Sequence, residues 1–455
     1  MIHTQLLKIG NFNLKLKHLL ILVVLILSFS ISLILRSQVL DYGYELNEFD
    51  PFFNFRATEF LLNNGLFEYL DWHDVKSWYP NGRDISATSQ VMLHVTAAIT
   101  YQIFGSSMEL YDFTILFPGI IGALTTIVIF ALVRTIGGTT AGLFGSLLFA
   151  ISVPIIIRGT MGWFKSEPLG LFYGLFGLYL FLSGIKSDNK KITISKLIGG
   201  GVFLAFGLAS WGGIQFFVIP IGIFIFILPF LRKDFRFLIW SVPVFVISLL
   251  MTTAIFERPG MGFVLGMGGF SLIIPTIFLI ICSFIHKFNN SKNQTRNYLI
   301  LLVSIVVIGS SVMIINTENH FLPSPSFRYL NAINPFLTTT NPLVDSVAEH
   351  STTTIHESFF MHSILMIFAG LGVWIIFNKL KSESSKDFPR DLMVFTLILG
   401  LTGVYVGSAF VRLELFTSIS VIFLSSIGLS IITKEIFNYK KQFYPIRNKI
   451  IKISY

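Results

Sequence analysis

The sequence predicts an all-α, polytopic transmembrane helical protein of about 12 spans with two long outer loops. Hydrophobic residues make up 53% of its 455 residues and charged residues only 13%, and the mean hydropathy is +0.74. Apolar runs of about 20 residues recur along the chain, which is the length that a helix needs to cross a hydrocarbon core of about 30 Å. Short basic segments separate many of these runs, as in loops that stay in the cytoplasm. This composition excludes a soluble globular protein.

The first apolar run follows Lys8, Lys15 and Lys17 and has no convincing small-residue cleavage site. We therefore expect a retained first helix with its N-terminus in the cytoplasm. Spans are expected at about 19–35, 112–133, 139–157, 168–185, 196–210, 213–231, 237–256, 267–285, 297–315, 358–378, 391–408 and 413–433. A turn at Gly137 and Gly138 divides the second from the third. In this register the basic loops and both chain ends lie in the cytoplasm.

Two long polar segments fall on the other side of the membrane, a first outer loop at about 38–111 and a fifth outer loop at about 316–357. The first is acidic in a chain whose net charge is +9. Its short apolar run at 91–104 is expected to be an interfacial helix, because counting it as a span would reverse the charge pattern of the later loops. Residues 1–455 are expected to form one multi-pass membrane domain, and long loops are expected to carry function.

The single cysteine and the basic charge exclude two further classes of site. Cys282 lies inside an apolar run, so neither a disulfide framework nor a thiolate metal site is expected. The sequence pI is about 9.4, but the basic residues lie in short loops between spans. No nucleic-acid partner is therefore expected.

Three carboxylates stand close to the ends of apolar runs on outer segments: Asp50, Glu167 and Glu349. Any one of them alone reads as a solvated loop acid. Together they favour a divalent cation site, because hard cations bind oxygen ligands gathered from separate segments. Sequence spacing does not show whether the three meet.

Several motifs surround these acids. They are EFDPFFNFRAT at Glu48–Thr58, SWYPNGR at Ser77–Arg83, RGTMGWFKSE at Arg158–Glu167, SWGG at Ser210–Gly213, SVAEH at Ser346–His350 and VRL at Val411–Leu413. In number and order they resemble the motifs of the catalytic subunit family of the N-glycosylation oligosaccharyltransferases, over about residues 40–433. The resemblance implies transfer of an oligosaccharide from a polyprenyl phosphate or pyrophosphate carrier to Asn in an Asn-x-Ser/Thr acceptor. It places the active loops on the non-cytoplasmic face of the cell membrane.

The resemblance also assigns roles to the carboxylates. Asp50 and Glu349 are expected to bind Mn²⁺ or Mg²⁺ and to orient the acceptor amide, with Glu167 as a further metal ligand and Arg158 beside the cluster as a catalytic residue. Carboxylates that hydrogen-bond both amide N–H groups help because the amide lone pair is delocalised and the nitrogen is a poor nucleophile. The metal is expected to stabilise the leaving phosphate oxygen.

Substrate binding is assigned by resemblance to Arg412 and Trp211, with Arg412 contacting the peptide upstream of the acceptor Asn. Two plainer interpretations stay open. Arg412 can form a local ion pair with Glu414 that ends a helix, and Trp211 can be an interfacial anchor.

The carboxylate of the fifth outer loop has two candidates. The segment Thr354–Glu357 resembles the bacterial form of the fifth-loop motif, so Glu357 competes with Glu349. Glu349 is preferred because its motif is the longer match. The neighbouring His350 and His356 are expected to be loop residues and not metal ligands.

Two departures from the family pattern affect the expected function. Lys165 stands where the family has a metal-ligating aspartate, and an ammonium group repels a cation and cannot ligate it. We expect Lys165 to pair with the carboxylates Asp50 and Glu349 and to compete with the divalent ion. The C-terminal soluble recognition domain of the family is also expected to be absent from this chain.

Two functions therefore remain open at this stage. The first is an oligosaccharyltransferase membrane subunit, or half of a split enzyme whose recognition domain comes from a second chain. The second is a degenerate, non-catalytic relative that binds the lipid-linked oligosaccharide or scaffolds an active transferase. An unrelated transporter is a third class, and its charged residues would face a cavity at the membrane midplane.

Overall fold

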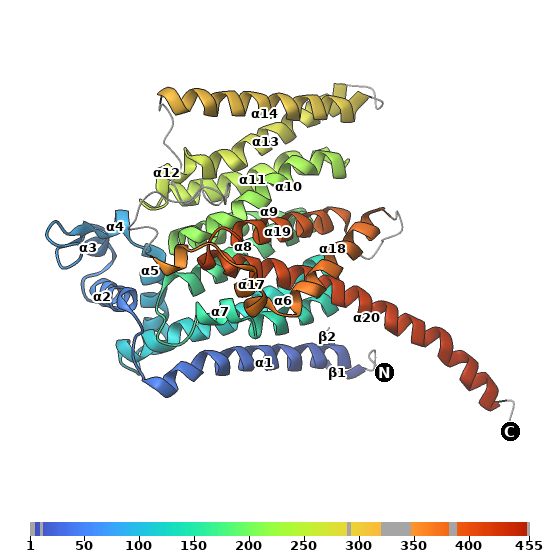
Figure 1. The fold of residues 1–455 in the computed structure, drawn as a ribbon, viewed down its shortest axis with the longest axis horizontal. Helices are drawn as coiled ribbons and strands as arrows, with labels where there is room; N and C mark the ends of the chain where they lie inside the picture. Colours follow the sequence, from blue (N-terminus) through green and yellow to red (C-terminus); the bar gives the residue numbers. More distant parts are fainter. Residues whose placement is uncertain (1–4, 10–11, 289–292, 320–346, 382–388, 453–455) are drawn as a thin grey trace.

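The structure is a computed structural model that describes residues 5–9, 12–288, 293–319, 347–381 and 389–452. Long helices lie side by side in a bundle, and a group of short elements, α2 to α4, projects beyond one end (Figure 1). The last helix, α20, extends beyond the bundle at the opposite end. The residues of the candidate site lie at the end that carries α2.

Within the described residues, ten helices are long and apolar enough to cross a membrane. They are built on α1 (Leu16–Ser37), α6 (Leu110–Ala150), α8 (Ser166–Ile185), α9 (Lys190–Ser210), α10 (Gln215–Leu231), α11 (Phe235–Ala254), α13 (Met267–Phe288), α14 (Gln294–Asn319), α19 (Arg390–Gly407) and α20 (Glu414–Lys452). An eleventh candidate is the pair α17 (Ile355–His362) and α18 (Leu365–Lys381), which is bent by 89°.

Helix α6 supplies two of the predicted spans, because it folds back on itself at Gly138. Gly138 has φ of +81°, a left-handed conformation that glycine adopts without a Cβ penalty. The two arms then pack closely: a Cβ added at Gly142 would lie 2.8 Å from the carbonyl oxygen of Phe130. The predicted glycine turn is therefore present, and the helices agree with the prediction of about 12 spans.

The shorter elements connect and cap these helices. They are η1 (Gln38–Tyr42), α2 (Phe49–Asn64), α3 (Leu66–Leu70), α4 (Ile85–Thr88), α5 (Val91–Thr100), the π-helical turn η2 (Tyr101–Gly105), α7 (Val153–Ile157), η3 (Gly212–Ile214), α12 (Gly260–Val264), η5 (Ala348–His350) and η6 (Val411–Leu413). Helix α5 with η2 is the predicted apolar run at 91–104, and it is too short to cross a membrane. Much of the predicted fifth outer loop lies outside the described residues.

The all-α prediction is confirmed. Within the described residues, the strands form only two short antiparallel hairpins. One pairs β1 (Gln5–Ile9) with β2 (Phe12–Lys15), and the other pairs β3 (His73–Asp74) with β4 (Arg83–Asp84).

Close backbone contacts and buried phenylalanines hold the bundle together. Helices α8 and α9 pack at Gly177 and Gly200, where an added Cβ would meet the backbone of the opposite helix. Small residues allow such approaches between membrane helices, where water provides no hydrophobic driving force. Fully buried rings such as Phe181, Phe224 and Phe395 fill the space between α8, α10 and α19.

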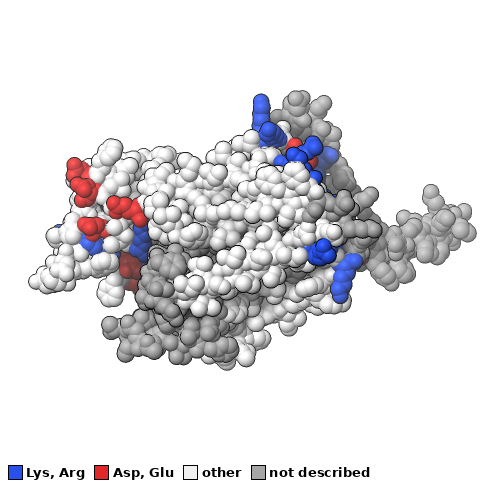
Figure 2. All heavy atoms as spheres, turned by 90° about the horizontal axis from the view of Figure 1, so that it is seen from above, with Lys and Arg blue, Asp and Glu red and all other residues white. Residues whose placement is uncertain are grey.

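Charge is separated along the bundle. Acidic side chains gather at the end where α2, α3 and α4 lie, and Lys and Arg side chains predominate at the opposite end (Figure 2). The uncharged surface between them is what a protein that spans a membrane requires. The chain is a multi-pass membrane protein with one acidic and one basic end.

Candidate functional site

Four segments meet at the acidic end of the bundle: the start of α2, the turn between α7 and α8, η5, and η6. Backbone hydrogen bonds join them in pairs. The N–H of Asn47 donates to the carbonyl of Gly162 at 3.0 Å, and the N–H of Val411 donates to the carbonyl of Ser351 at 3.0 Å. Residues far apart in the sequence are thereby brought to one site.

Lys165, at the N-cap of α8, reaches the carboxylates at the start of α2. Its Nζ donates to the Glu48 carboxylate and lies 3.3 Å from Asp50 Oδ2. The Lys165 side chain is only 13% exposed, whereas that of Asp50 is 74% exposed. The Lys165 ammonium lies 4.3 Å from the ring centroid of Trp163. The predicted contact with Asp50 is present, and Glu48 is a partner that the sequence analysis missed. The predicted pair between Lys165 and Glu349 is not formed, because Glu349 pairs with Arg158 and Arg412.

Glu349 is held by two arginines. Arg158 Nη1 donates to Glu349 Oε1 at 2.6 Å, and Arg412 Nη1 lies 3.5 Å from Glu349 Oε2. Burial raises the pKa of the Glu349 carboxyl, but the hydrogen bond from Arg158 and the charges of Arg158, Arg412 and Lys165 outweigh burial. The pKa of Glu349 is therefore below its ordinary value, and the group is ionised at neutral pH.

Glu167 is nearly buried, in the first turn of α8. Its side chain is 3% exposed, and its Oε1 accepts a hydrogen bond from Arg412 Nη2 at 3.1 Å. Its other oxygen, Oε2, is buried and has no hydrogen-bond partner among the described residues. Arg412 thus links Glu167 to Glu349.

The alternative ion pair between Arg412 and Glu414 does not form. Glu414 accepts instead from Ser358 Oγ at 2.6 Å and contacts His362 Nε2 at 2.6 Å. Both partners belong to α17, so Glu414 attaches that helix to the start of α20. Arg412 therefore pairs with Glu167 and Glu349 and not with Glu414.

The competing carboxylate Glu357 has a local role. Its Oε2 accepts from the backbone N–H of Thr354 at 2.8 Å, and the Thr354 hydroxyl accepts from the N–H of Glu357 at 3.2 Å. This reciprocal pair is a capping box at the start of α17. In this arrangement Glu349, and not Glu357, contacts Arg158.

Trp211, predicted to bind substrate, is a buried residue at the end of α9. It is 6% exposed, and its ring stacks on Phe416 with centroids 5.4 Å apart. Phe416 lies in the first turn of α20, four residues after Arg412. The geometry gives Trp211 a packing role against the start of α20, which differs from an anchor exposed at the membrane interface.

The predicted metal ligands do not form a metal site in this arrangement. Lys165 is paired with Asp50, and arginines are paired with Glu167 and Glu349. Among the described residues, no three His, Cys, Asp or Glu side chains come close enough together to hold a metal ion. The residues as placed therefore fit a charge-paired cluster and do not fit Mn²⁺ or Mg²⁺.

A buried polar chain supports the turn that carries Lys165. Asn54 Nδ2 donates to the carbonyl of Phe164 at 2.8 Å, so Asn54 Oδ1 must accept from His94 Nε2, which lies at 3.0 Å. His94 Nδ1 then accepts from the Tyr69 hydroxyl at 2.5 Å. Burial and the charge of Arg83 lower the pKa of His94 to about 3, so the ring is neutral. The sequence signal for this network was a histidine in a mostly apolar helix.

The β3–β4 hairpin beside α3 gives a pH-dependent prediction. His73 Nδ1 lies 2.6 Å from Asp84 Oδ1, and Nε2 lies 3.0 Å from the carbonyl of Asn81, so both ring nitrogens face acceptors. The hydrogen bond to Asp84 and then that to Asn81 raise the pKa of His73 above its ordinary value. Because the folded pKa is raised, this contact stabilises the hairpin fully below pH of about 6.5 and is lost as the pH rises through the folded pKa.

An NMR titration of the His73 imidazole tests this prediction. We expect the Asp84→Asn variant to lower the pKa of His73 and to weaken the pH dependence of hydrogen exchange in the hairpin. An unchanged His73 pKa in Asp84→Asn would show that the contact is not formed in solution.

Comparison with known proteins finds one family model and several relatives that match most of the chain. The family model described as "Oligosaccharyl transferase STT3, N-terminal" matches residues 19–426. The chain is 25% identical over 408 residues to the dolichyl-diphosphooligosaccharide–protein glycosyltransferase subunit STT3B of Arabidopsis thaliana, covering 88% of this chain and 54% of that protein. It is 26% identical over 434 residues to the subunit STT3 of Dictyostelium discoideum, covering 92% of this chain and 58% of that protein.

The fold is similar to solved structures of an archaeal protein. The oligosaccharyltransferase AglB from Archaeoglobus fulgidus, in complex with an inhibitory peptide and a dolichol-phosphate, matches with a TM-score of 0.71 at 16% identity, over 94% of this chain and 52% of that chain. The A. fulgidus enzyme in complex with Zn and sulfate matches with a TM-score of 0.67 at 15% identity, over 91% of this chain and 49% of that chain. The present chain thus spans about half the length of the relatives that it matches.

Proposed function

Because this chain belongs to the STT3 oligosaccharyl transferase family, we propose that it acts in protein N-glycosylation. The proposed reaction is transfer of an oligosaccharide from a polyprenyl phosphate or pyrophosphate carrier to Asn in Asn-x-Ser/Thr acceptors. The observation that carries the proposal is the convergence of Asp50, Arg158, Glu167, Glu349 and Arg412 at one end of the bundle.

The geometry supports different roles for the anionic and the cationic groups of the site. Asp50 is exposed, so its carboxylate can accept hydrogen bonds from an acceptor amide, and ionised Glu349 offers a second acceptor. Arg158 and Arg412 hold Glu349 in place. Lys165 provides a positive charge beside Asp50 that attracts the phosphate of the donor and stabilises it as it leaves.

The predicted Mn²⁺ or Mg²⁺ requires a different arrangement of this site. A divalent ion bound by Asp50, Glu167 and Glu349 competes with Lys165, Arg158 and Arg412 for these carboxylates. Among them, Glu167 Oε2 is buried and has no hydrogen-bond partner in the described residues.

A second function is favoured by one specific contact. Lys165 pairs with both Glu48 and Asp50, and it stands where the family pattern places a metal-ligating aspartate. A site whose carboxylates are paired in this way suits a relative that binds the lipid-linked donor or scaffolds an active transferase, without catalysing transfer itself.

A transfer assay separates the two functions. The purified chain in lipid nanodiscs is mixed with a radiolabelled polyprenyl-linked oligosaccharide and an Asn-x-Thr peptide, alone and with a second chain that supplies a soluble recognition domain. Glycopeptide formation supports the transferase. Saturable donor binding without glycopeptide supports the non-catalytic relative, and absence of both contradicts transfer and donor binding by this chain.

Orientation in the membrane is a further part of the proposal. We infer that the acidic end faces away from the cytoplasm and the basic end faces it, on the basis of the charge separation in Figure 2. Reporter fusions at Lys190 and Lys381 are expected to read as cytoplasmic and an insertion at Asp71 as external. The reverse pattern would place the site in the cytoplasm and contradict the proposed reaction.

A further inference from the structure

Arg36 lies near the outer end of α1 and holds both sides of the turn that contains Arg158. Its Nη1 donates to the Ser32 hydroxyl at 2.6 Å and its Nη2 to the carbonyl of Ile155 at 3.4 Å. Its backbone carbonyl accepts from the N–H of Met161 at 3.0 Å. Arg158 therefore stands between two residues that are both bound to Arg36.

The burial of Arg36 is hard to explain by stability alone. The residue is 1% exposed, no carboxylate among the described residues pairs with it, and its Nε has no hydrogen-bond partner there. Placing a charge in low dielectric without an opposite charge is strongly unfavourable, and an apolar side chain of similar volume avoids that cost. The arginine is therefore better explained by what its charge and its hydrogen bonds do to the neighbouring turn.

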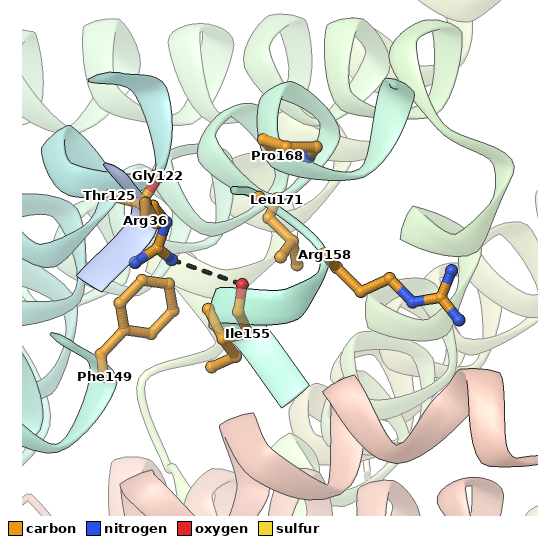
Figure 3. A pocket seen from close by; sticks show the side chains of 9 residues that line it. Arg36, Gly122, Thr125, Phe149, Ile155, Arg158, Pro168 and Leu171 are labelled. Atoms are coloured by element: carbon orange, nitrogen blue, oxygen red, sulfur yellow. Dashed lines mark hydrogen bonds between the residues drawn. The ribbon is translucent and has the colours of Figure 1, made fainter. Parts of the chain in front are cut away.

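The adjacent helix is shaped to admit this side chain. Gly122 of α6 packs against the Arg36 guanidinium, and a Cβ added at Gly122 would collide with Nε. Figure 3 shows Arg36 and Arg158 beside one small cavity, with the dashed bond running from Arg36 to Ile155 and the Arg158 side chain pointing away from Arg36. Two guanidinium groups repel, so the charge of Arg36 disfavours the inward position of Arg158.

We propose that Arg36 is a positioning residue, which fixes the 155–161 turn and directs Arg158 outward onto Glu349. This inference rests on the proposed function, because the contact between Arg158 and Glu349 matters only if the site binds donor or acceptor. The contact itself can be measured without any substrate, which keeps the two ideas separable.

The experiment uses a water-soluble carbodiimide, which forms an amide bond between a lysine amine and a carboxylate in contact with it. The carbodiimide takes up the elements of water from this condensation and leaves as a urea. The Arg158→Lys variant gives Glu349 a reactive amine partner. In the same molecule the native contact of Lys165 with Glu48 provides an internal reference. Mass spectrometry of the digested protein yields the ratio of the two links.

The ratio is then measured in Arg158→Lys proteins that carry a second substitution, either at Arg36 or at a control position. We expect Arg36→Met to lower the ratio about fivefold, as the loss of one hydrogen bond implies, and Arg36→Lys to retain most of it because the charge is kept. Arg232→Met, which breaks the ion pair with Asp391 elsewhere in the bundle, should leave the ratio unchanged.

Three results would overturn the inference. They are an unchanged ratio in Arg36→Met, an equal fall in Arg232→Met, and no link to Glu349 even with Arg36 intact. If Arg36→Met does not fold, Gly122→Ala is used in its place. This variant keeps Arg36 but displaces the arginine side chain, and the inference requires that it also lower the ratio. A chain that shows the expected ratios but neither binds donor nor transfers glycan would overturn only the proposed function.

Discussion

The Lys165→Asp variant is expected to bind Mn²⁺ about tenfold more tightly than the native chain, or tighter still. The substitution removes an ammonium that contacts Glu48 and Asp50 and adds a third carboxylate beside them. At an effective dielectric of about 20, a unit charge pair at 4 Å interacts by about 4 kcal/mol, and solvent at the exposed Asp50 reduces this value. A third of this interaction energy is already enough for a tenfold change in the affinity for Mn²⁺.

Titration of purified protein with Mn²⁺, followed by electron paramagnetic resonance of the free ion, measures this effect. Without metal the variant should also unfold at a lower temperature than the native chain, because three carboxylates repel, and Mn²⁺ should restore the loss. Lys76→Asp is the matched control, since it makes the same change at an exposed lysine of the first outer segment. Equal Mn²⁺ affinity in the native chain and Lys165→Asp would contradict the competition between ammonium and metal.

If the native chain has transfer activity, Lys165→Asp tests the role of the ammonium in it. Competition with the metal predicts faster Mn²⁺-dependent transfer in the variant. Stabilisation of the leaving phosphate by Lys165 predicts slower transfer. Robust native turnover that the substitution does not improve would show that Lys165 is part of a working site.

Glu349→Gln is expected to lower donor-dependent transfer about 100-fold. The amide cannot form ion pairs with Arg158 and Arg412, so the segment carrying η5 loses its attachment to the site. Misplacement of a catalytic group by about 1 Å is enough for a loss of this size. If the chain is a non-catalytic relative, the same change should weaken donor binding.

The matched control for this prediction is Glu357→Gln, in the same part of the chain. Glu357 belongs to the capping box of α17, and Gln can take the same place in a capping box, so the variant should leave both the helix and the site intact. A larger functional loss in Glu357→Gln than in Glu349→Gln would reverse the assignment of the fifth-loop carboxylate.

The helices were predictable because the signal for them is local. A run of about 20 apolar residues must be helical in hydrocarbon, where every backbone group needs a partner within its own segment. The turn at Gly138 was predictable for a related reason, since glycine tolerates the left-handed conformation found there. The motifs identified the family, which the match over residues 19–426 then established.

Partners within the site were predicted less well. Arg412 has an acid two residues away, yet it binds Glu167 and Glu349, which are distant in sequence. Glu48 precedes Asp50 by two residues and gave no signal as the partner of Lys165. Such choices depend on which side chains the packed helices bring within 4 Å, and sequence spacing carries no information about that distance.

The sequence by itself determined the all-α membrane architecture, the positions of the long polar segments and the candidate acids. The tertiary structure alone decided that Lys165, Arg158 and Arg412 neutralise those acids, and that Arg36 is enclosed behind Arg158. The physical reason is that apolar length and charge pattern are properties of a segment, whereas an ion pair depends on two segments meeting. At this site the segments are joined by the packing of α1, α6, α8 and α20, and that packing is the sum of many contacts that no single motif records.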